Sequence, residues 1–131
     1  MINASEYLKI LVAEDNRVMG NVIKFNLERS GFDVFLVYDG RAAIERLKED
    51  TFDLVITDYQ MPHASGEDIC RYVRLDSAHR DLPVILVSAK GIELQISGLV
   101  GPDRFTRVIF KPFSPREIVK VVSEVLNPTS V

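Results

Sequence analysis

The sequence predicts an α/β domain with an open, doubly wound parallel sheet of five strands and helices on both of its faces. Short apolar runs alternate with amphipathic segments along the chain, which is the pattern of repeated strand–helix units. The runs are continuously apolar, as strands covered on both faces should be. The chain has 131 residues, 47% of them hydrophobic, so we expect a single domain over residues 1–131 with its core at about 8–126.

Five apolar runs predict the strands, at residues 8–13, 34–37, 54–57, 84–87 and 108–110. A helix is expected between the first two strands, at residues 17–30, and Gly31 stands where a helix C-terminal glycine belongs. This helix should bury one apolar face, formed by Val22, Ile23 and Leu27.

Capping signals mark the starts of three further helices. Asp39 can cap a helix that runs to about Lys48. The sequence Ser65-Gly66-Glu67-Asp68 resembles a capping box, and Ser114-Pro115-Arg116-Glu117 combines a serine cap with proline at the first helical position. Glycines interrupt the stretch around residues 92–99, so any helix there should be short or irregular.

Composition excludes several classes of protein. The net charge of −3 argues against a nucleic-acid-binding surface, which is usually basic. The clearest apolar runs are too short to span a bilayer, and the N-terminus lacks the basic and apolar stretches of a secretory signal. The only cysteine, Cys70, cannot form an internal disulfide. We therefore expect a cytoplasmic protein.

Charged and polar residues follow four of the five predicted strands. Glu14 and Asp15 follow the first strand, and Asp58 follows the third. The fourth strand ends in Ser88, and Lys111 follows the fifth. Ligands of such sheets bind outside the carboxyl ends of the strands, so we expect these side chains to meet at one edge.

Three clustered carboxylates repel one another, and a divalent cation removes that conflict. Oxygen ligands select Mg²⁺, with Mn²⁺ as the alternative, and Mg²⁺ keeps open positions for phosphate oxygens. A lysine and a serine hydroxyl nearby could neutralise and orient a phosphoryl group in transfer. A carboxylate can itself accept that group as an aspartyl phosphate.

At this point the sequence resembles the response regulator receiver family over almost its whole length. The resemblance lies in four motifs at successive strand ends, namely Glu14-Asp15-Asn16, Asp58-Tyr59-Gln60-Met61-Pro62 with Gly66, Ser88-Ala89, and Lys111-Pro112-Phe113. It implies a flavodoxin-like sheet with strand order 2-1-3-4-5. It also implies a two-component signalling switch rather than an enzyme that turns over a separate substrate.

The resemblance assigns roles to these residues. Asp58 would accept a phosphoryl group from a phosphohistidine on a histidine kinase or a histidine phosphotransfer protein. Asp15, Asp58 and the backbone carbonyl of Gln60 would bind Mg²⁺ directly, and Glu14 would act through water. Lys111 would contact the phosphoryl oxygens, and Ser88 would turn inward after phosphorylation. The resemblance further implies a cis peptide bond between Lys111 and Pro112.

The chain departs from the family pattern at the fifth strand. The family usually places Tyr or Phe three residues before the lysine, where this chain has Val108. Phe105 and Phe110 lie nearby, but neither occupies that position. The sequence Gly101-Pro102-Asp103-Arg104 is also unusual for the family. We therefore expect an atypical output surface.

Two alternative functions remain open. A small Mg²⁺-dependent phosphatase would fit the fold, but a haloacid-dehalogenase-type enzyme needs a second aspartate where Gln60 stands, and no phosphate-binding loop of the Gly-x-x-x-x-Gly-Lys type is present. A degenerate receiver could bind partners without being phosphorylated. His63 and His79 are expected to be solvated loop residues, because no further histidine or cysteine accompanies them.

Overall fold

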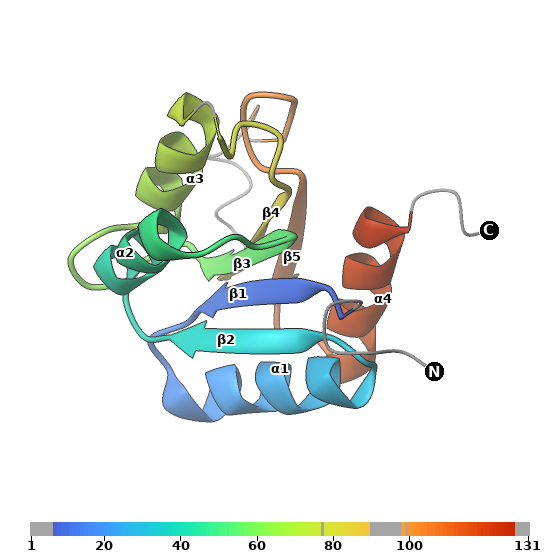
Figure 1. The fold of residues 1–131 in the computed structure, drawn as a ribbon. Helices are drawn as coiled ribbons and strands as arrows, with labels where there is room; N and C mark the ends of the chain where they lie inside the picture. The colour runs from blue at the N-terminus through green and yellow to red at the C-terminus, as the bar shows by residue number, and fades with distance from the viewer. Residues whose placement is uncertain (1–6, 77, 90–97, 99, 128–131) are drawn as a thin grey trace.

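The computed structural model describes residues 7–76, 78–89, 98 and 100–127, and these residues contain the predicted sheet (Figure 1). Its five strands are all parallel and lie in the order β2-β1-β3-β4-β5. Their bounds are β1 Lys9–Ala13, β2 Asp33–Val37, β3 Leu54–Asp58, β4 Val84–Ala89 and β5 Arg107–Lys111. The predicted fold class and strand order are confirmed.

Within the described part of the chain, two helices cover each face of the sheet. Helices α2 (Gly40–Glu49) and α3 (Gly66–Leu75) lie on one side, and α1 (Arg17–Arg29) and α4 (Pro115–Leu126) lie on the other (Figure 1). Each side has its own cluster of buried apolar side chains. Because neighbouring strand residues point to opposite faces, Leu11 joins the cluster under α2 and α3, whereas Ile10 joins the other.

The helix ends follow the capping signals. Asp39, Ser65 and Ser114 are the N-caps of α2, α3 and α4, and the Ser65–Asp68 capping box is complete in both directions. At the C-terminus of α1, Gly31 adopts a φ of 98°. Its N–H donates to the Glu28 carbonyl while the Phe32 N–H donates to the Leu27 carbonyl, which together form a Schellman motif.

The buried face of α1 differs from the prediction. Ile23 and Leu27 are buried, but Val22 is 38% exposed. With Val18 and Phe25, which are 75% and 58% exposed, it forms an apolar stripe that faces away from the sheet. The helical period places these three side chains on one face, yet nothing in that period says whether the face meets the core or the solvent.

Two further predictions concern His79 and the segment at residues 92–99. His79 is not solvated, because its side chain is only 14% exposed and its Nδ1 lies 2.9 Å from Asp76 Oδ2. The irregular segment predicted at residues 92–99 lies almost wholly outside the described residues. None of the helices that the structure describes is long and apolar enough to cross a bilayer.

Candidate phosphoryl and metal site

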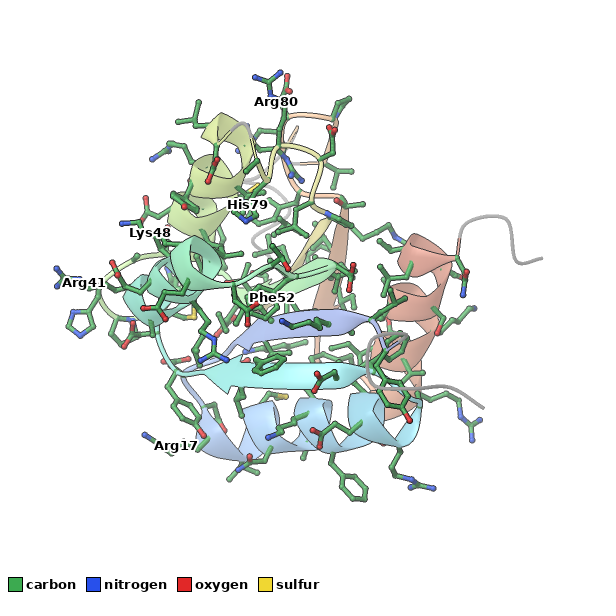
Figure 2. All side chains as sticks on the ribbon, viewed as in Figure 1. Arg17, Arg41, Lys48, Phe52, His79 and Arg80 are labelled. Atoms are coloured by element: carbon green, nitrogen blue, oxygen red, sulfur yellow. The ribbon has the colours of Figure 1, made fainter. Side chains whose placement is uncertain are left out.

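The predicted site residues gather at the carboxyl edge of the sheet. Arg17 and Arg41, near the starts of α1 and α2, mark this edge in Figure 2. Glu14 directly follows β1, whereas Asp58 and Lys111 are the last residues of β3 and β5. Strands β3 and β5 extend further than predicted, so Asp58 and Lys111 belong to the strands rather than to the loops after them.

The three carboxylates lie within reach of one cation. Glu14, Asp15 and Asp58 each offer an oxygen atom, and these atoms all lie within 4.8 Å of one another. Lys111 sits between two of them, with its Nζ 3.3 Å from Asp58 Oδ2 and 3.5 Å from Glu14 Oε1. The cluster therefore combines three acidic groups with one contacting ammonium.

Glu14 is the buried member of the acidic cluster. Its side chain is 2% exposed, and this burial raises its pKa from 4.5 to about 7. The Asn16 N–H, which donates to Glu14 Oε2 at 3.1 Å, and the Lys111 charge oppose the rise, whereas Asp58 and Asp15 add to it. A bound divalent cation would favour the ionised form of this carboxyl group.

Asp58 is held from two directions. Its Oδ1 accepts a hydrogen bond from the Tyr59 N–H at 2.9 Å, while its Oδ2 faces Lys111. The side chain remains 14% exposed, so a reacting group can approach it. Gly66 packs behind it, where a Cβ would lie 2.4 Å from the Asp58 carbonyl oxygen, which leaves room only for glycine.

Ser88 supplies a free hydrogen-bonding group beside this edge. Asp58 pairs with Val87 in the β3–β4 register, so Ser88 comes one residue beyond that pair. Its side chain is buried, and its Oγ has no hydrogen-bond partner among the described residues. Burying a hydroxyl group without a hydrogen-bond partner destabilises the folded state, and a ligand oxygen would provide that partner.

The region around Lys111 contains the predicted cis peptide bond and the three residues that depart from the family pattern. The Lys111–Pro112 peptide bond is cis, as predicted. Val108 pairs with Leu86 and is partly buried, whereas Phe105 is fully buried in the cluster under α2 and α3. Phe110 is half-buried and lies opposite Ser88 in the β4–β5 register.

Gln60 and Arg17 come shortly after β3 and β1, at the carboxyl edge of the sheet. Gln60 is exposed in the loop that follows β3. Arg17, two residues after Asp15, stacks its guanidinium 3.8 Å from the centre of the Tyr38 ring, which is a cation–π contact. This contact was not predictable from the sequence, because Tyr38 follows β2 and nothing in the sequence links it to Arg17.

The donor set fits a hard divalent cation. Every candidate ligand atom is a carboxylate oxygen, and such sets select Mg²⁺ or Mn²⁺ over softer metals. Glu14, Asp15 and Asp58 are the residues that could hold it, with Lys111 balancing the remaining negative charge.

Comparisons with known proteins agree with this geometry. The family model described as the response regulator receiver domain matches residues 10–123. A response regulator receiver domain from Francisella is 28% identical, with a TM-score of 0.81 and coverage of 94% of this chain and 99% of that one. The receiver domain of sensor histidine kinase PA1611 from Pseudomonas aeruginosa is 26% identical, with a TM-score of 0.80 and coverage of 92% of this chain and 98% of that one. The structure of that domain has magnesium in the active site cleft.

The chemotaxis response regulator CheY4 of Vibrio cholerae shares the fold, with 24% identity, a TM-score of 0.84 and coverage of 92% of this chain and 99% of that one. The chain belongs to the response regulator receiver domain family of two-component signalling. Its acidic trio of Glu14, Asp15 and Asp58 is consistent with the phosphoacceptor site of such a domain. Receiver domains pair with histidine kinases and typically act as phosphoacceptor switches rather than as true enzymes.

Proposed function

We propose that this chain, as one receiver domain over residues 1–131, is a signalling switch that accepts a phosphoryl group on Asp58 in the presence of Mg²⁺. The observation that carries the proposal is the contact of Asp58 with Lys111 at 3.3 Å inside a cluster of three carboxylates. The domain catalyses only its own phosphorylation and dephosphorylation.

Accessibility and charge favour Asp58 as the acceptor over its neighbours. Glu14 is buried, so it is a poorly accessible nucleophile. Asp15 is exposed, but no described contact joins it to the lysine. Asp58 alone combines partial exposure with direct contact to the Lys111 ammonium.

The transfer itself is a displacement at phosphorus. One oxygen of Asp58 forms a bond to phosphorus as the bond from phosphorus to the imidazole nitrogen of a phosphohistidine breaks. The electron pair of that bond stays on the nitrogen, and the histidine leaves with a proton taken from solvent. Lys111 would neutralise the phosphoryl oxygens, and the free Ser88 hydroxyl would donate to one of them.

Mg²⁺ would supply charge neutralisation and orientation for the phosphoryl oxygens when bound. Asp15 and Asp58 would hold it directly, with the Gln60 carbonyl, and Glu14 would act through water. The magnesium in the cleft of the Pseudomonas relative supports Mg²⁺ as the ion. Mn²⁺ would serve as the alternative ion.

The exposed stripe on α1 supports a helical phosphodonor as the partner. Val18 lies three residues after Asp15, and Val22 and Phe25 extend the stripe along the helix away from the site. A phosphohistidine on a helix bundle could therefore reach Asp58 while an apolar helix face of the donor packs on this stripe. The donor would be a histidine kinase or a histidine phosphotransfer protein.

Intact mass spectrometry tests the proposal. The protein is incubated with acetyl phosphate and Mg²⁺, with Asp58→Asn and a chelator as controls. One added phosphoryl group, absent in both controls, is the expected result. Absence of any adduct on the wild-type protein would instead favour a receiver that binds partners without phosphorylation, and repeated turnover of phosphate esters would favour the phosphatase.

A further inference from the structure

Helix α3 directly contacts the backbone of the phosphoacceptor. The Gly66 N–H, in the first turn of α3, donates to the Tyr59 carbonyl at 2.8 Å. The same glycine packs so closely on the Asp58 carbonyl that no side chain would fit between them. Any displacement of the backbone at Asp58 must therefore be accommodated by the start of α3.

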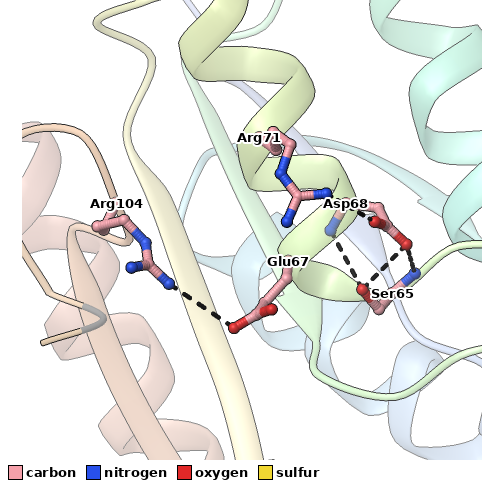
Figure 3. Close-up of polar contacts among 5 residues, drawn as sticks. All are labelled: Ser65, Glu67, Asp68, Arg71 and Arg104. Atoms are coloured by element: carbon pink, nitrogen blue, oxygen red, sulfur yellow. Dashed lines mark hydrogen bonds and ion pairs between the residues drawn. The ribbon is translucent and has the colours of Figure 1, made fainter. Parts of the chain in front are cut away.

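The same helix holds the turn that leads into β5, at two points. Glu67 Oε1, in the first turn of α3, lies 3.7 Å from Arg104 Nη2 (Figure 3). In the last turn, Arg74 Nε and Nη2 donate to the Arg104 carbonyl at 3.0 and 2.7 Å. Glu67 and Arg74 are seven residues apart and share one helix face, so both reach the turn at residues 100–106.

The two attachments differ in strength. The Arg74 guanidinium also donates to the carbonyls of Arg80 and Leu82, so its contacts form one satisfied set. The Glu67–Arg104 ion pair is long, and its side chains are 35% and 48% exposed. Such a pair contributes little stability, so it can open without disrupting the fold.

Tyr59 connects this weaker attachment to the phosphoacceptor. Its N–H donates to Asp58 Oδ1, and its carbonyl accepts a hydrogen bond from the N–H of Gly66, the residue before Glu67. Burial, followed by the Glu67 charge, raises the pKa of the Tyr59 hydroxyl, whereas Arg104 lowers it. A movement of the Tyr59 backbone therefore moves the start of α3, and with it the Glu67 carboxylate that pairs with Arg104.

We propose that Tyr59, Glu67 and Arg104, which we call the α3 bridge, carry the phosphorylation state of Asp58 to the turn before β5. The proposal rests on the proposed function. A carboxylate oxygen that becomes part of an acyl phosphate is a weaker acceptor, so the Tyr59 N–H bond loosens. Tyr59 then shifts with the start of α3, the Glu67–Arg104 pair opens, and only the Arg74 contacts still hold the turn. This route needs no aromatic side chain at Val108.

Amide hydrogen exchange measured by NMR tests the α3 bridge. The reporters are the N–H groups of Gly101, Arg104 and Thr106, which donate to the carbonyls of Phe105, Gly101 and Val84. In the wild-type protein, acetyl phosphate with Mg²⁺ should speed their exchange by roughly two- to fivefold. In Glu67→Gln and in Arg104→Gln, exchange should be fast already and should change little on phosphorylation.

Glu124→Gln is the matched control. It removes a comparably exposed ion pair, to Arg107 at the start of β5, at 3.2 Å. This variant should respond to phosphorylation as the wild-type protein does. A full wild-type response in Glu67→Gln, or loss of the response in Glu124→Gln, would overturn the α3 bridge.

Intact mass, recorded on the same samples, separates this proposal from the proposed function. Glu67 does not contact the acidic trio, so Glu67→Gln should acquire the same phosphoryl adduct as the wild-type protein. An adduct on Glu67→Gln together with an unchanged turn response overturns only the bridge. Absence of an adduct on the wild-type protein overturns the proposed function, and the bridge with it.

Discussion

The two ends of this molecule place their charged side chains among different partners. At the carboxyl edge of the sheet, three carboxylates face one another, with Lys111 in contact with two of them. At the far end of α3, the Arg74 guanidinium donates to three neutral backbone carbonyls. The first arrangement gains from binding a cation or accepting a phosphoryl group, whereas the second is complete as it stands. Substitutions at the first should therefore change chemistry, and substitutions at the second should change stability.

Lys111→Ala should have the largest effect. It removes the ammonium that contacts Asp58, so phosphorylation by acetyl phosphate should slow by about 100-fold, the usual cost of losing a group that stabilises developing charge. The rate is followed by intact mass at fixed Mg²⁺. Lys48→Ala removes an exposed lysine of α2 and should leave the rate unchanged. A Lys111→Ala rate within threefold of wild type, on the order of experimental scatter, would argue against the role of this ammonium.

Glu14 should make the metal-free protein less stable as the pH rises. Its folded pKa of about 7 exceeds the ordinary value of 4.5, so the folded state binds the extra proton between these values. The stabilisation of the folded state by the protonated Glu14 is complete below pH 4.5 and is lost as the pH rises through 7. Urea unfolding between pH 5 and 8 should show a loss of roughly 2–3 kcal/mol from this group.

Glu14→Gln should remove most of that slope, whereas Glu28→Gln, on the exposed side of α1, should keep it. Saturating Mg²⁺ should also reduce the slope, because the metal favours the ionised carboxyl groups. A slope that is identical in Glu14→Gln would show that another group is responsible.

Arg74→Ala tests the other end of the molecule. It leaves the carbonyls of Arg80, Leu82 and Arg104 without their donor, so the free energy of unfolding should fall by about 2 kcal/mol. Arg71→Ala, one turn earlier on the same helix, loses only an exposed contact to Asp68 and should cost less than about 0.5 kcal/mol. Equal losses in the two variants would remove the contrast between the two ends of the molecule.

Phe25→Ser should have the smallest effect on the isolated protein. Phe25 is 58% exposed, so stability should change by less than about 0.5 kcal/mol. Transfer from a phosphohistidine donor protein should slow by roughly tenfold, while transfer from acetyl phosphate should not change, because the small donor needs no docking surface. Equal slowing with both donors would assign Phe25 to the site rather than to docking.

These contrasts also separate what the sequence could predict from what it could not. The alternation of apolar runs predicted the sheet, because each run is a doubly covered strand, and the parallel topology then brought Glu14, Asp58 and Lys111 to one edge. The exposure of Val22 was not predictable, since a helical period is the same for a core face and a partner face. The function of Arg74 was hidden as well: its acceptors are backbone carbonyls, which every residue carries.

The central claim is that Asp58, and no neighbouring carboxylate, receives the phosphoryl group. Borohydride reduction of the acyl phosphate formed from acetyl phosphate and Mg²⁺ converts the acceptor aspartate to homoserine, which peptide mass mapping can locate. The account predicts homoserine at position 58 and unmodified Asp15. Reduction at Asp15 with Asp58 unchanged would contradict it.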